Sequence, residues 1–98
     1  MNGKRRPNLS PGVPVSRFYE VSNAERLRDL CGPHHRYLHR LEDKLKDFGL
    51  RAESQGGGIL LAGTAEGVSI AEAALAELER RMRAGVDITD MDLDAAIE

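Results

Sequence analysis

The sequence predicts an α+β domain in which helices pack on one face of a three-stranded antiparallel sheet, with a short helix added at the end. Three patterns carry this prediction: a β-branched and aromatic segment after residue 14, a leucine stripe with helical spacing, and a glycine-centred hairpin over residues 50–62. Together with an alanine-rich segment after Gly63, they give the order strand, helix, helix, strand, strand, helix.

Size and composition fit one small domain. The 98 residues, 41% hydrophobic and 31% charged, suffice for a single core. The single cysteine, Cys31, excludes an internal disulfide and suits a reducing compartment. The basic start leads into no apolar run and does not resemble a secretory signal, so we expect a cytoplasmic protein without a membrane partner.

Charge is divided unevenly along the chain. Residues 1–50 contain ten Lys or Arg and six Asp or Glu, whereas residues 51–98 contain four and ten. A basic first half is typical of a protein with an anionic partner, although solvated faces can segregate in the same way. Residues 1–14, with three prolines and the run Lys4-Arg5-Arg6, predict a flexible basic arm.

The first strand and two helices are predicted over residues 15–49. Residues Val15–Val21 form the strand, with Val15, Arg17, Tyr19 and Val21 on one face. A capping box at Ser22-x-x-Glu25 starts a short helix that Gly32 stops, and Pro33 fits the first turn of the next helix. The buried stripe of that helix is Leu38, Leu41, Leu45 and Phe48, and Gly49 ends it.

A hairpin and a long helix complete the expected domain, residues 15–86. Gly56-Gly57-Gly58 supplies the turn, and the inward-facing residues are Leu50, Ala52, Ser54, Ile59 and Leu61. The long helix begins at a cap on Thr64 or at a second capping box, Ser69-x-x-Glu72, and Gly85 ends it. Its inward-facing residues are Ala71, Ala74, Leu75, Leu78 and Met82.

Residues 87–98 predict a terminal helix. Thr89 caps it, with Ile88 and Leu93 at the hydrophobic staple positions. The helix reaches Glu98 without a stop signal, and acidic residues at a helix C-terminus oppose the macrodipole. We therefore expect it to lead toward a further segment.

The joint between the first two helices resembles the loop of a KH domain. In KH domains a GXXG loop clamps single-stranded nucleic acid by bringing backbone amides and a helix N-terminus to phosphates. Here Gly32-Pro33-His34-His35 occupies that place, with His35 where the second glycine is expected. The resemblance implies the KH type I order, β-α-α-β-β-α.

A closer resemblance is to the N-terminal domain of PhoH-family proteins, over roughly residues 15–98. It is carried by "LRDLCGPHHRYLHRLEDKL", by "QGGGILLAG", and by an alanine-rich helix ending at "AGVDIT". The sequence departs from the family at Gln55, where Arg is usual, at Gly57, where Asn is usual, and at His35, where Asp is frequent. The family is associated with phosphate starvation, and its ATP is bound by a following P-loop domain. No Gly-x-x-x-x-Gly-Lys-Ser/Thr motif occurs in this sequence, so the resemblance implies an accessory module without a cofactor of its own.

Single-stranded RNA binding is one function that these residues suggest. The candidate phosphate contacts are Gly32, Pro33, His34, His35, Arg36, Arg40 and Arg51. Two features oppose it: a ring at His35 limits close backbone approach, and the acidic second half repels a long strand. Because histidine gains charge toward pH 6, binding through this loop should strengthen as pH falls.

Protein interaction is the alternative that we favour. The partner would be the chain's own or another ATPase domain, a second copy in a homo-oligomer, or a ribosome-associated protein. Leu50, Leu60 and the terminal helix suggest apolar surface that a neighbour would cover.

Metal binding and catalysis receive less support. Cys31, His34, His35 and His39 are close in sequence, but no second cluster accompanies them, and a cysteine at a helix end suits a small buried apolar residue. Glu42 and Asp43 are adjacent and therefore point apart on a helix. We expect neither a metal site nor an enzyme in this chain alone.

Overall fold

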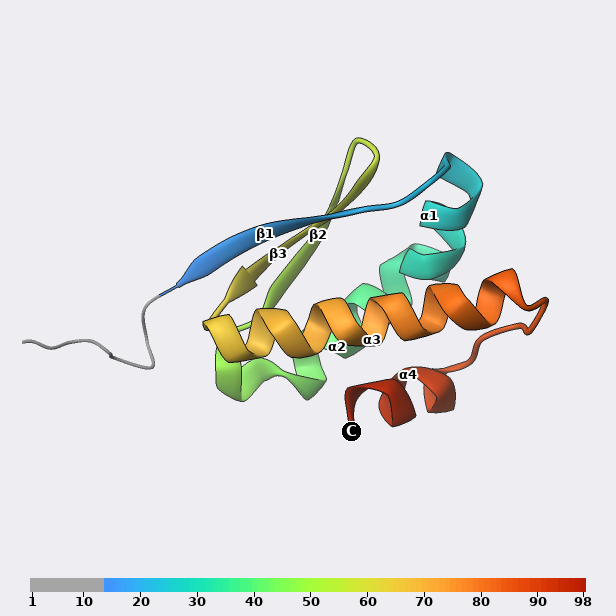
Figure 1. Cartoon of the computed structure of the whole chain (residues 1–98). Helices are drawn as coiled ribbons and strands as arrows, with labels where there is room; N and C mark the ends of the chain where they lie inside the picture. The colour runs from blue at the N-terminus through green and yellow to red at the C-terminus, as the bar shows by residue number, and fades with distance from the viewer. Residues whose placement is uncertain (1–13) are drawn as a thin grey trace, which may run out of the picture.

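The computed structural model describes residues 14–98 and has the predicted α+β class. The elements in chain order are β1 (Val15–Glu20), α1 (Ala24–Cys31), α2 (Arg36–Lys44), β2 (Arg51–Gln55), β3 (Gly58–Gly63), α3 (Ala65–Arg83) and α4 (Asp90–Ile97) (Figure 1). Short 3₁₀ turns, Pro33–His35 and Lys46–Phe48, precede and follow α2. The predicted basic arm, except Pro14, lies outside the described residues.

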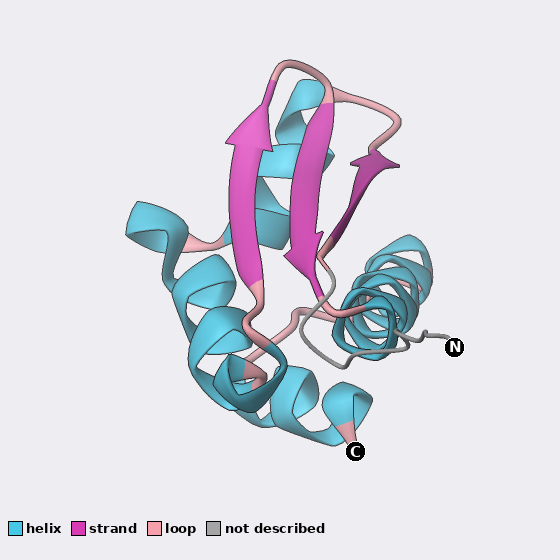
Figure 2. Ribbon diagram, turned by 90° about the vertical axis from the view of Figure 1, so that its left-hand side faces the viewer, coloured by secondary structure: helices cyan, strands magenta, loops and turns pink. Residues whose placement is uncertain are grey.

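The three strands form one antiparallel sheet in the order β1-β3-β2, which confirms the predicted sheet (Figure 2). Helix α3 contacts β1 and β3, and α2 contacts β2. Because side chains alternate along a strand, Ile59 and Leu61 face the helices, as predicted, and Tyr19 lies on the same face. Phe18 and Leu60 pair in register on the opposite face, where Phe18 is 48% exposed.

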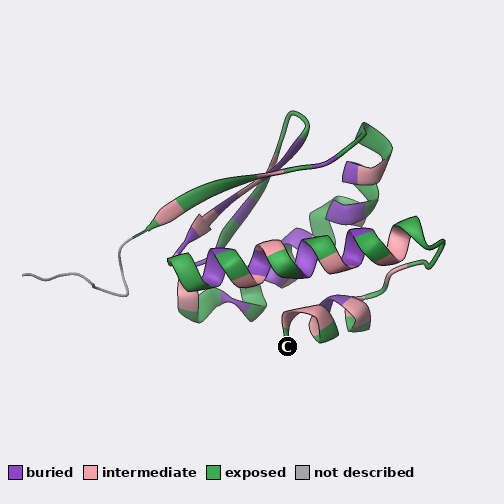
Figure 3. Ribbon diagram, in the orientation of Figure 1, coloured by how far each residue is buried: buried purple, intermediate pink, exposed green. Residues whose placement is uncertain are grey.

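One core joins the sheet to all four helices (Figure 3). Its largest fully buried side chains are Leu30, Leu38, Leu41, Ile59, Leu61, Leu75, Leu78, Leu93 and Val68. The prediction that Leu50 contributes exposed apolar surface is wrong, since Leu50 is 3% exposed within this core. The residue lies between the 3₁₀ turn that follows α2 and the start of β2, where it packs into the core.

Helix starts follow side-chain caps, in one case shifted from the predicted residue. The first helix is capped by Asn23, whose Oδ1 accepts from the Arg26 N–H at 2.7 Å, so the predicted capping box at Ser22 is wrong by one position. Asparagine caps as well as serine does, which explains why local sequence did not separate the two. Thr64 caps α3 by accepting from the Gly67 N–H, and Thr89 and Asp92 form a reciprocal capping box on α4.

Helix α2 is shorter than predicted at both ends. It begins at Arg36 rather than Pro33, because His34 and His35 have left-handed backbone angles that cannot continue a right-handed helix. It ends at Lys44, so Phe48 lies in the following 3₁₀ turn, half-buried, and not on the α2 stripe. Gly49, at φ 66°, then turns the chain toward β2.

Helix α4 packs against α3 and α2 and places Leu93, 1% exposed, in the common core. Its staple residue Ile88 also packs against that core. None of the helices in residues 14–98 is both long and apolar enough to cross a bilayer.

Candidate nucleic-acid interface

The α1–α2 joint, Gly32–His35, has an unusual backbone. Gly32 has φ 81° and ψ 171°, a combination open essentially to glycine alone. A Cβ on Gly32 would lie 2.7 Å from Cδ2 of Tyr37. His34 and His35 follow at φ 53° and 60°, and the His35 N–H donates to the Gly32 carbonyl at 3.1 Å. Three of the four loop residues therefore have positive φ, two of them without being glycine.

This loop points into solvent at the tip of α2. Residues 33–36 are all exposed, whereas the adjacent Cys31 and Leu38 are buried. No side chain of the described part of the chain caps the first turn of α2. The leading N–H groups of a helix have no intrahelical partners, so this tip is polar and open.

A small hollow, which we call the α1–β2 groove, opens beside the loop. Its volume is about 190 Å³, and it is lined by Ala24, Leu27, Arg28, Cys31, Gly32, His35 and Ser54. That volume is below the roughly 300–1,000 Å³ typical of small-molecule pockets. The groove therefore suits contact with one flat group, such as a base, better than enclosure of a substrate.

The floor of the groove is apolar and its rim is polar. Leu27 and Cys31 are buried, and burial raises the pKa of the Cys31 thiol, which keeps it neutral. At the rim, Arg28 is exposed and has no ion-pair partner within residues 14–98. His35 and Ser54 complete the rim from the loop and from β2.

Helix α1, which forms one wall of the groove, is fixed by a part-buried polar cluster. Glu79 of α3, 6% exposed, accepts from the Tyr19 hydroxyl at 2.6 Å, and Arg26 Nη1 lies 3.9 Å from its other oxygen. Burial, followed by the bond to Glu79, raises the pKa of Tyr19 well above its usual range. Tyr19 thus remains a neutral donor, and the cluster ties β1, α3 and α1 together.

The arginines predicted to accompany the loop lie elsewhere. Arg40 forms a bidentate pair with Asp94 of α4, at 2.7 and 2.6 Å, and Arg36 pairs in the same way with Asp90. These bonds lower the pKa of both aspartates. The structure thus turns Arg36 and Arg40 toward α4, and neither arginine lines the α1–β2 groove.

Arg51 is separated from the groove as well. It lies at the start of β2, three residues from Ser54, and its side chain is 83% exposed. Its Nε is 3.7 Å from Oε2 of Glu42, an oxygen that also accepts from the Ala52 N–H at 2.9 Å. Of the seven predicted contact residues, the structure gathers Gly32, Pro33, His34 and His35 in one loop, with Gly32 and His35 lining the groove.

Sequence reasoning missed Arg28 and Ser54 on the groove, and Asp90 and Asp94 as arginine partners. The available signal for Arg28 was its place one turn before Gly32, at the end of α1. For the aspartates it was spacing: Arg36 and Arg40, like Asp90 and Asp94, are four apart and so share one helix face.

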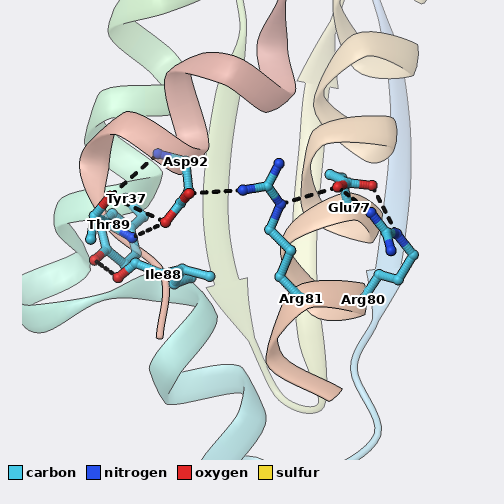
Figure 4. Close-up of polar contacts among 7 residues, drawn as sticks. All are labelled: Tyr37, Glu77, Arg80, Arg81, Ile88, Thr89 and Asp92. Atoms are coloured by element: carbon cyan, nitrogen blue, oxygen red, sulfur yellow. Dashed lines mark hydrogen bonds and ion pairs between the residues drawn. The ribbon is translucent and has the colours of Figure 1, made fainter. Parts of the chain in front are cut away.

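The opposite side of the loop faces a wider, open hollow of about 690 Å³ between α1 and the α3–α4 linker. Charges of both signs line it, including Arg26, Asp29 and Asp87, so its electrostatics favour no single ligand class. Arg28 and Gly32 line this hollow as well as the α1–β2 groove. The Tyr37 hydroxyl donates to the Ile88 carbonyl at its edge, and Arg81 bridges Glu77 and Asp92 nearby (Figure 4).

Within residues 14–98, no three His, Cys, Asp or Glu side chains are placed to hold a metal ion together. Comparisons with protein-family models, with curated proteins and with solved structures found no match for this chain.

Proposed function

We propose that this chain is a KH-like accessory domain of a PhoH-type ATP-binding protein, and that it contacts single-stranded RNA through the α1–β2 groove. The accessory role rests on the sequence resemblance of residues 15–98. The antiparallel order β1-β3-β2, with two helices between β1 and β2, supports the KH-like assignment. The observation that carries the RNA proposal is the exposed loop Gly32–His35 beside a groove with an apolar floor and a cationic rim.

Two parts of the site would contact the RNA, one its phosphates and the other a base. The uncapped first turn of α2 offers backbone N–H groups to a phosphate, and Arg28 adds a charge without an internal partner. Ala24, which is exposed, and the small accessible part of Leu27 offer an apolar contact for one base. His35 already has the left-handed φ that a glycine would supply, so the loop keeps its turn despite the side chain.

The proposal is tested by fluorescence anisotropy with a uridine octamer RNA at about 50 mM and about 200 mM salt. We expect Arg28→Gln to weaken binding about fivefold and to lower the salt dependence by about one phosphate contact. The matched control is Lys46→Gln, which removes the same charge from an exposed site at the other end of α2. Equal effects of the two substitutions would contradict binding at the groove.

A second candidate function, protein contact, is supported by the open face of the sheet. Phe18 is 48% exposed there beside Leu60 and Ala62, which are half-buried, and such an apolar patch suits a neighbouring domain or subunit. The two functions use different surfaces. Phe18→Ser should therefore leave RNA binding unchanged while weakening any self-association measured by sedimentation.

A further inference from the structure

We propose that α4 is a displaceable cover whose aspartates occupy a second phosphate-contact surface, formed by Arg36, Arg40 and Lys44, that continues from the loop along α2. The inference rests on the proposed RNA function and adds its regulation. RNA that enters the groove would extend onto this surface only after α4 moves away.

The charges of the two helices match in spacing, with two aspartates of α4 facing three cations of α2. Arg36, Arg40 and Lys44 recur every four residues, so they form one row on α2. Asp90 pairs with Arg36, and Asp94 pairs with Arg40 and lies 3.9 Å from Lys44. Each bidentate arginine holds a carboxylate in the geometry that it also uses for phosphate. The row is therefore already a site for planar or tetrahedral oxyanions, which α4 fills.

The row is continuous with the loop. Arg36 directly follows His35, and its side chain remains 62% exposed although it is paired with Asp90. A phosphate on the loop could thus approach Arg36 from solvent before α4 leaves. This continuity favours a polyanion with successive phosphates over an isolated acidic group.

Helix α4 is short, and it is held by one buried leucine, by partly buried residues and by ion pairs to α2 and α3. It has eight residues, too few for an independently stable helix in water. Leu93 is its one fully buried residue, Ala96 and Ile97 pack partly buried against the core, and Met91 is 78% exposed. A short terminal helix that buries only one large side chain is a part of a fold that can open locally before the rest does.

The chain also contains a fixed point from which α4 can move. Tyr37 of α2 donates to the Ile88 carbonyl at 3.1 Å, just before the Thr89 cap. Gly85, at φ 83°, begins the preceding linker. On the other side of α4, Asp92 pairs with Arg81 of α3 at 2.8 Å, which limits how far the helix opens while that pair is intact (Figure 4).

The test compares Asp90→Asn/Asp94→Asn with the control Asp87→Asn/Glu98→Gln. Both double variants change the net charge equally within residues 87–98, but within the described chain neither Asp87 nor Glu98 forms an ion pair. We expect the first to bind the uridine octamer at least about fivefold more tightly than the control. Adding Arg36→Gln/Arg40→Gln should remove that gain. Hydrogen exchange of residues 90–97 should accelerate when wild-type chain is saturated with RNA.

Two results would contradict the proposal that α4 is a displaceable cover. One is an equal gain in both double variants, which would reflect overall charge alone. The other is unchanged hydrogen exchange of residues 90–97 at RNA saturation. If their hydrogen exchange instead became faster on adding an acidic protein, the surface would be assigned to such a protein partner. Failure of the proposed function would give a different result. Arg28→Gln and Lys46→Gln would then bind RNA equally, both with Asp90 and Asp94 present and with asparagine at these two positions.

Discussion

The two sides of α2 differ in whether the nearby arginines are paired with carboxylates. Toward α4, the cationic side chains Arg36 and Arg40 are each paired with a carboxylate. Toward β2, the α1–β2 groove has an exposed arginine, Arg28 of α1, and a loop at which no side chain of the described residues caps α2. Arg28 belongs to α1, whereas Arg36 and Arg40 share one face of α2, so these cations lie on different surfaces. Position in the fold, more than basic composition, decides which charges are free for a partner.

Leu93→Ala should have the largest effect and should act on the α4 side alone. Removing a fully buried leucine typically costs 2–5 kcal/mol, and we expect about 3 kcal/mol here from urea unfolding. The matched control, Met91→Ala, should stay within about 0.5 kcal/mol of wild type because Met91 is exposed. Similar losses in the two variants would mean that α4 contributes little to the core.

Gly32→Ala should damage the loop that both sides share. A Cβ would meet the Tyr37 ring at 2.7 Å, on a backbone that only glycine adopts readily, so we expect a loss of about 2 kcal/mol. Gly57→Ala is the control, since no described atom lies within 4 Å of its added Cβ. A Gly32→Ala protein as stable as the Gly57→Ala protein would contradict the described loop.

His35→Gly should stabilise the fold, by up to about 1 kcal/mol, because glycine adopts φ 60° without the steric cost that histidine meets. His39→Gly provides the contrast, since His39 lies within α2, where glycine costs about 1 kcal/mol. Thermal unfolding of the two proteins should shift in opposite directions. A decrease for both would show that the histidine ring contributes contacts that offset its strained backbone.

The smallest expected effect is the pH dependence of the α4 side. The bonds from Arg36 and Arg40 hold the pKa of Asp90 and Asp94 below the ordinary value of 3.8. A lowered pKa means stability that is present above that ordinary value and is lost as pH falls through the folded-state pKa. The melting temperature of wild type should exceed that of Asp90→Asn/Asp94→Asn at neutral pH, and the difference should vanish in strong acid. A difference independent of pH would exclude these ion pairs as its source.

Periodicity predicted the frame of the molecule because burial imposes it directly. The alternation around Tyr19, the stripe Leu38, Leu41 and Leu45, and the glycine turn each reflect one local rule, and the structure has all three. The predictions that were wrong concern positions where local sequence rules do not distinguish the alternatives. Ser22 and Asn23 are equally good N-caps, and no sequence pattern predicts a histidine with left-handed backbone angles.

The site was less predictable because it depends on contacts distant in sequence. The bonds of Arg36 to Asp90 and of Arg40 to Asp94 each span 54 residues. The groove exists only once α1, the loop and Ser54 of β2 come together. Sequence identified the loop itself, Gly32–His35, because the glycine and proline mark a helix joint, but not which charges would face it.

The Glu42 carboxylate, which accepts from the Ala52 N–H, also affects how this sheet could grow. Ala52 lies on an outer strand, and its outward N–H is a group that a foreign strand would need for pairing. With that donor occupied and a negative charge at the margin, β2 resists edge-to-edge addition and the aggregation that follows from it. A strand from another molecule would more readily add along β1, at the far margin of the sheet.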